Sequence, residues 1–340
     1  MPSTGKGRQR RNIAWRLYGG ARRLPSGPGR ATYEASAHRL QDPPIVTELF
    51  FAPAQPARGL ILLTGEDRAS FLQGLISNDV RQVGPTRAIW AALLTAQGKY
   101  LHDFFVASLG EGWLIEGEGE RVADLKRRLG IYKLRAKVVI EDVSDRFEVL
   151  QAWGADAGHA FGLAEPGQAV EQDGATAFLD PRLTTLGLRL IAPKGTGAGR
   201  LATLGLAPGD IAAWDRLRLS LGIPDGSRDM VLEKAILLEN GFDELHGVAW
   251  DKGCYVGQEL TARTKYRGLV KKRLMPVAVE GPLPEPGTLI LKDGQEAGEI
   301  RSGRDGLAVA LVRLEALEAG GPLTAGDATV RPQRPDWAKF

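Results

Sequence analysis

Apolar residues recur along the chain with two periods, one typical of strands and the other typical of helices. Short apolar runs between glycine-containing turns predict strands, whereas apolar residues three or four positions apart predict helices. Over residues 45–145 the pattern predicts, in chain order, strands at 47–51 and 60–63, a helix at 67–76, a hairpin of 88–94 and 100–107, a strand at 113–116, a helix at 120–129 that ends at Gly130, and a strand at 137–140. This order indicates a first α+β unit.

Residues 146–268 repeat this order and form a second predicted α+β unit. It begins with a strand at 147–152, continues with a hairpin over 177–191, and includes a helix after Asp210, whose side chain is a favourable N-cap. Over residues 269–335, short apolar runs alternate with glycine turns, which predicts a small antiparallel β-barrel. The predicted fold class is therefore α+β, with two ferredoxin-like-type units followed by a C-terminal antiparallel β-barrel.

Residues 1–44 differ from the rest of the chain in composition, and we predict a disordered, basic, low-complexity leader. The first 40 residues hold nine of the 44 Lys and Arg residues but only one of the 41 Asp and Glu residues. The net charge of +3 is therefore the sum of a basic leader and a remainder that is acidic by five charges, so it does not indicate nucleic-acid binding. A disordered tail, an organelle transit peptide and an incorrectly assigned start are three open interpretations. We expect a cytoplasmic protein, or one of the mitochondrial matrix if the leader is a transit peptide.

Signals for disulfides, metal sites and membrane spans are sparse. The sequence has one cysteine, Cys254, which excludes an internal disulfide and favours a reducing compartment. The four histidines are scattered, so we expect no metal site made by one copy of the chain, and iron–sulfur ligation through Cys254 would need a second chain or a partner. The longest stretch without charge, residues 88–98, is shorter than the roughly 20 residues of a membrane-spanning helix. We therefore expect no membrane partner, and we expect a monomer.

The densest group of reactive and polar residues lies at Lys252–Glu259, with the sequence KGCYVGQE. Gly253 and Gly257 flank Cys254 and allow close backbone approach, and the nearby Lys252 favours the thiolate form of the cysteine. The alternative is that Cys254 is a small buried apolar residue, as isolated cysteines commonly are. The company of Tyr, Gln and Glu in one short segment favours a functional role, because core packing does not require these residues together.

This octapeptide resembles the K-G-C-Y-x-G-Q-E signature of the YgfZ family, the folate-binding relatives of the glycine-cleavage T-protein that support iron–sulfur enzymes. Further segments resemble that family in the same order, at 71–80, 96–103, 214–224 and 298–314. The resemblance spans residues 47–330. It implies a tetrahydrofolate pocket at the centre of three domains, and a role in assembly or repair of iron–sulfur proteins. The implied partners are iron–sulfur assembly factors or client iron–sulfur enzymes.

The resemblance also implies roles for individual residues. Cys254, Asp103 and Lys252 are the candidate catalytic residues, with Cys254 as the redox or transfer centre. The candidate folate-binding residues are Trp214, Tyr255, Gln258, Glu259, Arg263 and Asn78. The indole of Trp214 suits a pteridine by stacking, although its helical spacing fits a core aromatic residue equally well.

His102 and Asp103 stand where T-proteins that transfer aminomethyl groups carry an acidic pair. Only Asp103 is a carboxylate, which argues against that transfer, although a His–Asp pair suits acid–base chemistry near neutral pH. A second interpretation is that Asp103 closes the hairpin through a backbone hydrogen bond. A folate-dependent one-carbon transferase is therefore the first alternative function.

A basic run follows the cysteine motif and consists of Arg263, Lys265, Arg267, Lys271, Lys272 and Arg273. Clustered cations bind phosphates, so a tRNA- or RNA-associated module is the second alternative function. The run contains one aromatic residue and belongs to an acidic body, which argues against nucleic acid as a partner. Solvated side chains, or a site for the polyglutamate tail of a folate, are the other interpretations.

Overall fold

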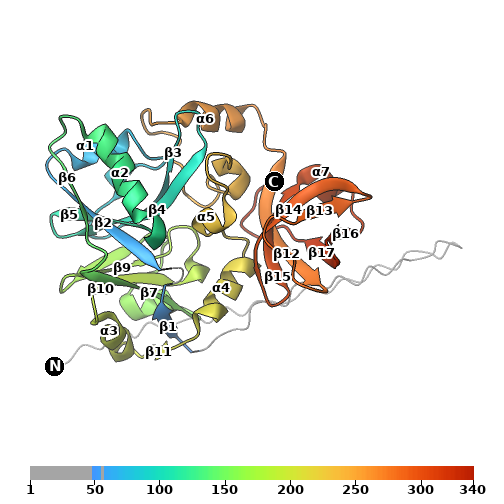
Figure 1. The fold of residues 1–340 in the computed structure, drawn as a ribbon. Helices are drawn as coiled ribbons and strands as arrows, with labels where there is room; N and C mark the ends of the chain where they lie inside the picture. The colour runs from blue at the N-terminus through green and yellow to red at the C-terminus, as the bar shows by residue number, and fades with distance from the viewer. Residues whose placement is uncertain (1–47, 55–56) are drawn as a thin grey trace, which may run out of the picture. The chain divides into compact units, whose positions relative to one another are not determined.

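The computed structural model describes residues 48–54 and 57–340 of the chain. Its first sheet has five antiparallel strands in the order β3-β4-β5-β2-β6 (Figure 1). The strands are β2 (Arg58–Thr64), β3 (Ile89–Leu94), β4 (Tyr100–Leu109), β5 (Gly112–Glu118) and β6 (Val139–Asp142). The predicted hairpin is confirmed as β3 and β4, which pair from Ile89 opposite Val106 to Leu94 opposite Tyr100.

Helices cover one face of this sheet with apolar side chains. The helical elements are α1 (Arg68–Gln73), the 3-10 turns η1 (Val80–Gln82) and η2 (Gly119–Arg121), and α2 (Val122–Lys133). α2 packs Val122, Leu125 and Leu129 into the core of the first unit. The predicted end of this helix at Gly130 is wrong, because an exposed glycine costs a helix only about 1 kcal/mol and the packing of the preceding turn maintains it. The helix ends where Leu134 adopts a φ of +40°.

The second sheet has six strands in the order β11-β1-β7-β10-β9-β8. The strands are β1 (Phe50–Pro53), β7 (Phe147–Trp153), β8 (Ala169–Gln172), β9 (Ala175–Leu179), β10 (Leu188–Pro193) and β11 (Ala207–Pro208); the helical elements are η3 (Ala157–Phe161), η4 (Thr184–Leu186) and α3 (Gly197–Thr203). β1 pairs with β7, placing Phe50 opposite Trp153, although the sequence division assigned this strand to residues 45–145. A local pattern identifies a strand but not the distant segment with which it pairs.

The segment between the second sheet and the barrel carries most of the candidate residues. Its helical elements are α4 (Ile211–Ser220), α5 (Gly226–Asp229), η5 (Leu237–Asn240) and α6 (Gln258–Tyr266). The cap predicted for α4 is confirmed, because Asp210 Oδ1 accepts a hydrogen bond from the backbone N–H of Ala212 at 2.9 Å. Among the described residues, no helix combines the length and the apolar character needed to cross a membrane. The predicted leader, residues 1–44, lies outside the described residues.

The C-terminal strands form a closed barrel in the order β12-β15-β14-β13-β16-β17, which confirms the predicted C-terminal antiparallel β-barrel. Its elements are β12 (Lys272–Glu280), β13 (Leu289–Lys292), β14 (Gln295–Arg304), β15 (Leu307–Arg313), α7 (Leu314–Glu318), β16 (Leu323–Ala325) and β17 (Ala328–Pro332). Small and branched apolar residues such as Val277, Ile300 and Val312 fill the interior. The predicted α+β class with two α+β units and a barrel is therefore confirmed.

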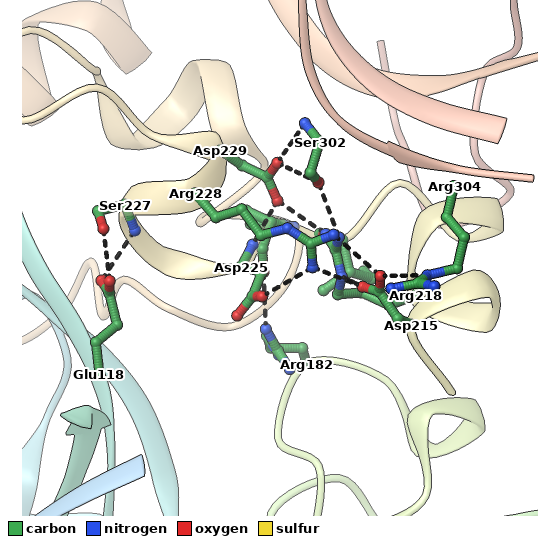
Figure 2. A network of polar contacts seen from close by, with 12 residues as sticks. Glu118, Arg182, Asp215, Arg218, Asp225, Ser227, Arg228, Asp229, Ser302 and Arg304 are labelled. Atoms are coloured by element: carbon green, nitrogen blue, oxygen red, sulfur yellow. Dashed lines mark hydrogen bonds and ion pairs between the residues drawn. The ribbon is translucent and has the colours of Figure 1, made fainter. Parts of the chain in front are cut away.

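A buried polar network joins α4 and α5 to the barrel and to the first sheet (Figure 2). Arg218 of α4 donates hydrogen bonds to Asp229 Oδ2 at 2.8 Å and to Ser302 Oγ of β14 at 2.9 Å. Asp229 of α5 also accepts a hydrogen bond from Ser302 Oγ at 2.6 Å. Ser227 of α5 donates to Glu118 of β5 at 2.5 Å. The short helix α5 is therefore hydrogen-bonded through its side chains to β5 of the first sheet and to β14 of the barrel.

Candidate functional site

Cys254 lies in the segment between η5 and α6, and it is exposed. This exposure contradicts the alternative of a small buried cysteine. The backbone after it is fixed, because the N–H of Val256 donates to the carbonyl oxygen of Gly74 at 3.1 Å. Gly257 has a φ of +81°, and a Cβ at this position would lie 2.5 Å from the carbonyl oxygen of Thr95. Only glycine therefore allows the segment to pack against the β3–β4 turn.

Lys252 anchors the same segment from within the protein. Its Nζ donates three hydrogen bonds, to the carbonyl oxygens of Gln73 at 2.8 Å, Ile76 at 2.7 Å and Asn78 at 2.7 Å. These bonds use all three N–H donors of the ammonium group, so none is left for the thiol of Cys254. Burial lowers the pKa of Lys252 from its ordinary 10.5 to about 8. The geometry therefore gives Lys252 a positioning role, whereas its place in the sequence indicated activation of the thiolate.

Asn78 and Tyr255 are buried parts of this anchor. Asn78 Nδ2 donates to the carbonyl oxygens of Trp90 at 2.8 Å and His246 at 2.7 Å. The backbone carbonyl oxygen of Asn78 accepts the hydrogen bond from Lys252 Nζ. The ring of Tyr255 lies 5.0 Å from Lys252 Nζ, and burial raises the pKa of its hydroxyl to about 12. Both residues support the backbone around the cysteine, and folate contact by either one stays a prediction.

The last residues of the motif begin α6. Gln258 is its first residue and is partly buried, while Glu259 and Arg263 are exposed. Glu259 Oε1 and Arg263 Nη2 form an ion pair at 2.5 Å, one helical turn apart. An exposed pair of this kind contributes only about 0–1 kcal/mol to stability. These charges are therefore on the solvent side of α6, and the buried side is formed by Thr261 and Thr264.

The basic run does not form one cationic patch. Lys272 pairs with Glu296 at 3.2 Å, and Arg273 is buried and pairs with Glu244 at 2.8 Å. Arg263, as described above, is paired within its own helix. Neutralised cations attract phosphate weakly, so these three residues contribute little to a phosphate-binding surface.

Asp103 is buried in β4, and both of its oxygens accept hydrogen bonds from side chains. Trp90 Nε1 donates to Oδ2 at 3.0 Å, and the Tyr100 hydroxyl donates to Oδ1 at 2.8 Å. Burial, together with the charge of Glu118, raises the pKa of Asp103. The carboxyl group therefore holds two aromatic side chains in the interior and does not close the hairpin through the backbone.

His102 is the neighbour of Asp103 in the sequence, but its side chain interacts elsewhere. Its Nε2 donates to Asp124 Oδ2 of α2 at 2.9 Å. Burial, followed in size by the charge of Arg121, lowers the pKa of His102 to about 4, so the imidazole is neutral near pH 7. The His–Asp pair considered from the sequence is not formed, because adjacent residues of a strand point to opposite faces of the sheet.

Trp214 of α4 is 4% exposed, and its Nε1 donates to the carbonyl oxygen of Leu186 at 2.9 Å. The guanidinium of Arg189 lies 5.9 Å from the centre of the indole ring. A pteridine can stack on this indole only after such contacts open, and Asp103 is likewise fully engaged. Two buried atoms near this site, Glu116 Oε2 and Arg189 Nε, nevertheless have no hydrogen-bond partner. The residues implied for folate therefore do not fit that group in this conformation.

A buried charge cluster between the two sheets was not identified from the sequence. Glu116 of β5 accepts hydrogen bonds from Arg58 at 2.8 Å and from Arg189 of β10 at 2.7 Å. Arg189 also lies 4.3 Å from the ring centre of Phe105. The partners are 58 and 73 positions apart in the chain. The only local signal is a single charge within an apolar strand, which indicates a buried partner without naming it.

The fold just described is shared with an enzyme of known structure. The chain is similar to the glycine cleavage system aminomethyltransferase T from Bartonella henselae, with a TM-score of 0.69 and 16% identity, covering 86% of each chain. Residues 271–340 match the family model described as CAF17, C-terminal beta-barrel domain. The fold and the barrel thus define the class, a protein with the aminomethyltransferase T fold that ends in a CAF17-type barrel.

Sequence relatives place the chain within this class. The iron-sulfur cluster assembly factor IBA57, mitochondrial, of Mus musculus is 34% identical and covers 78% of this chain and 78% of its own length. The Homo sapiens protein of the same name is 32% identical, with coverages of 82% and 83%. A homologue from Pyricularia oryzae is 33% identical, with coverages of 77% and 71%. The chain belongs to the family of the iron–sulfur cluster assembly factor IBA57, whose members are relatives of the YgfZ family, as the resemblance predicted.

Proposed function

We propose that this chain supports the assembly of iron–sulfur proteins, and that the thiol of Cys254 contacts the cluster or the sulfur that a partner presents. The observation that carries this proposal is a contrast within the motif: Cys254 is exposed, whereas Lys252 and Tyr255 on its two sides are buried. A reactive group held outward on a fixed backbone suits exchange with a second protein. The family supports the same role, because its members are named as iron–sulfur cluster assembly factors.

The chemistry of the cluster explains why a partner is needed. Iron–sulfur clusters are commonly held by about four cysteine thiolates, and this chain contains one cysteine. The remaining ligands therefore come from the protein that delivers or receives the cluster. When Cys254 binds an iron, its sulfur displaces one thiolate of the partner, and the proton that the Cys254 thiol loses is taken up by that displaced thiolate. No electron is transferred in this ligand exchange, and the cluster is cargo in transit.

Replacing Cys254 with alanine or serine tests this proposal in cells that lack the native copy. We expect the activity of cellular iron–sulfur enzymes to fall for both variants, most strongly under oxidative stress, because a hydroxyl group is a poorer ligand than a thiolate. Thr324→Ala is the matched control, because Thr324 is an exposed residue of the barrel. Unchanged enzyme activity with Cys254→Ala at a normal protein level would remove Cys254 from the mechanism.

Binding of reduced folate stays a prediction of the family resemblance. The unpartnered interior atoms of Glu116 and Arg189 support a polar ligand there, while the buried indole of Trp214 requires that the interior first open. Equilibrium dialysis with tetrahydrofolate tests the prediction. Saturable binding that is lost in Trp214→Leu would support it, and absence of binding to the folded wild-type chain would end it.

The two alternative functions have less support. A one-carbon transferase would require Asp103 to release Trp90 or Tyr100 before acting as a base. Turnover that depends on Asp103, with aminomethyl or N-methyl donors and tetrahydrofolate, would favour this alternative. For an RNA-associated module, salt-sensitive RNA retention by a chain lacking residues 1–44 is the corresponding test.

The names of the relatives also bear on where in the cell the protein acts. The relatives are named as mitochondrial, which supports the mitochondrial alternative and gives no support to the cytoplasmic expectation. The segment that bears on the choice, residues 1–44, lies outside the described residues. Fluorescence microscopy of the chain with and without this segment tests whether it directs import.

A further inference from the structure

A surface cleft of about 450 Å³ lies between α1 and the segment that follows α2. Phe71 and Leu75 line it from the side of α1, and Tyr132 and Leu134 line it from the other side. The cleft is separate from the interior where the two sheets meet. None of the candidate site residues named above lines it.

The outer wall of the cleft exposes large apolar side chains. Of the residues that line the cleft, Leu134 is 89% exposed and Tyr132 is 42% exposed. Leu134 also has a φ of +40° and a ψ of −108°, a strained conformation for a residue other than glycine. A strained backbone that directs a leucine into solvent is typical of an interaction surface, because it contributes nothing to the core.

The cleft and the cysteine segment flank the same short helix. Leu75 lines the cleft, and the adjacent residue, Gly74, accepts the hydrogen bond from the N–H of Val256 at 3.1 Å. Val256 is two residues after Cys254, whose side chain is exposed. A backbone hydrogen bond therefore connects the cysteine segment to the residue next to the cleft wall.

The charges on the rim favour an acidic occupant. Lys133 and Arg135 flank the exposed leucine, and neither forms an ion pair with any residue that the structure describes. The acidic side chains beside the cleft are already engaged by the chain itself. Asp67 Oδ2 accepts a hydrogen bond from the backbone N–H of Lys137 at 2.7 Å, and Glu66 pairs with the Lys137 side chain. The cations are thus available to carboxylates of a second molecule.

We propose that this cleft binds an apolar side chain flanked by carboxylates, on the surface of the protein that exchanges a cluster with Cys254. This proposal rests on the proposed function and names the chemistry of the partner. The apolar side chain packs between Leu75 and Leu134, and the carboxylates meet Lys133 and Arg135. Recognition then uses one side of α1 and exchange uses the other.

The test compares variants of the full chain in cells that lack the native copy, with the activity of an iron–sulfur enzyme as the readout. Leu134→Asp removes the apolar contact, and the double variant Lys133→Glu/Arg135→Glu reverses the charge. Leu289→Asp on β13 is the matched control, because Leu289 is a leucine that is 48% exposed on the barrel. We expect both cleft variants to lose activity to the level of Cys254→Ala. The control is expected to keep wild-type activity.

Measurements on the purified chains separate docking from folding and from the chemistry of the thiol. Both cleft variants should keep the wild-type melting temperature and the wild-type rate of Cys254 alkylation by iodoacetamide. If Leu134→Asp lowers the melting temperature, the charge-reversal variant decides the question, because its two side chains are exposed.

The outcomes distinguish this proposal from the function on which it rests. Loss of activity with Cys254→Ala but full activity with both cleft variants overturns the docking site and leaves the function intact. Full activity with Cys254→Ala overturns the function itself. An equal loss with Leu289→Asp overturns the docking site, because the effect is then not specific to the cleft. Binding of the purified chain to RNA or to phosphatidylglycerol vesicles that is lost in Leu134→Asp would also overturn it, by assigning the surface to that partner.

Discussion

Replacing Lys252 with methionine tests whether this residue positions the cysteine segment or activates its thiol. The variant keeps the length of the side chain and loses its three hydrogen bonds. The bonds to the carbonyls of Ile76 and Asn78 are buried, whereas the bond to Gln73 is partly open to water. A buried acceptor without a donor costs about 1–3 kcal/mol, so the two buried carbonyls cost about 2–6 kcal/mol. Part of this cost is offset because the variant no longer buries a charge, and we expect a net loss of about 3 kcal/mol.

Three measurements follow from this estimate. Urea unfolding should show the lower stability, and hydrogen exchange at the amide of Val256 should become faster because the segment loses its anchor. Alkylation of Cys254 by iodoacetamide should be as fast as in the wild type or faster, since the thiol is exposed in both. Lys271→Met is the matched control, because it removes an exposed lysine and should change none of the three.

One pattern of results would refute the positioning role of Lys252. If the ammonium charge favours the thiolate of Cys254, Lys252→Met will slow the alkylation while the free energy of unfolding stays unchanged. The structure predicts the opposite pattern, a loss of stability without slower alkylation. The direction of the change in the alkylation rate, together with the size of the change in the free energy of unfolding, therefore distinguishes the two roles.

Three further predictions concern buried ionisable groups. Asp229→Ala leaves the buried Arg218 without one of its carboxylate partners and should lower the free energy of unfolding by about 3–5 kcal/mol, whereas Arg218→Met added to it should recover part of the loss. Burial lowers the pKa of His102 to about 4, below its ordinary 6.5, so its contribution to stability is complete above pH 6.5 and is lost as the pH falls toward 4. Urea unfolding of His102→Gln should therefore show a smaller loss on acidification than the wild type, and an equal loss would contradict the assignment. Burial raises the pKa of Asp103, so its contribution is complete below its ordinary 3.8 and is lost as the pH rises; Asp103→Asn should accordingly gain stability relative to the wild type as the pH rises, as measured by the same unfolding experiment.

The elements that the sequence predicted well are those determined by neighbours in the chain. The β3–β4 hairpin follows from two apolar runs around a glycine turn, and α4 follows from its Asp210 cap and apolar spacing. The sheet membership of β1 was not predictable, because it depends on pairing with β7, about a hundred residues later. The end of α2 was missed for a related reason, since tertiary packing can maintain a helix through a glycine such as Gly130.

The candidate site shows the same limit at the level of side chains. The exposure of Cys254 argues against the buried alternative that the sequence left open, but the sequence did not show that its neighbour Lys252 donates to carbonyls more than 170 positions earlier. The separation of His102 from Asp103 was available from the sequence, because both lie in a predicted strand and adjacent strand residues face opposite sides. The cleft had a weak signal, apolar residues alternating with cations directly after α2, which resembles an ordinary helix end.

The proposed exchange between proteins makes different demands on the interior of the fold and on the exposed thiol. Trp90 and Phe242 stack at 3.8 Å, and Arg189 lies over Phe105, so aromatic and charged side chains fill the space where the two sheets meet. A small-molecule enzyme needs such an interior open to its substrate, whereas an exchange protein needs a fixed outward group with a docking surface beside it. Cys254 is exposed on a fixed segment, and the cleft beside α1 is the proposed docking surface. Variants of the interior should therefore change stability first, and variants of the α1 surface should change exchange with the partner first.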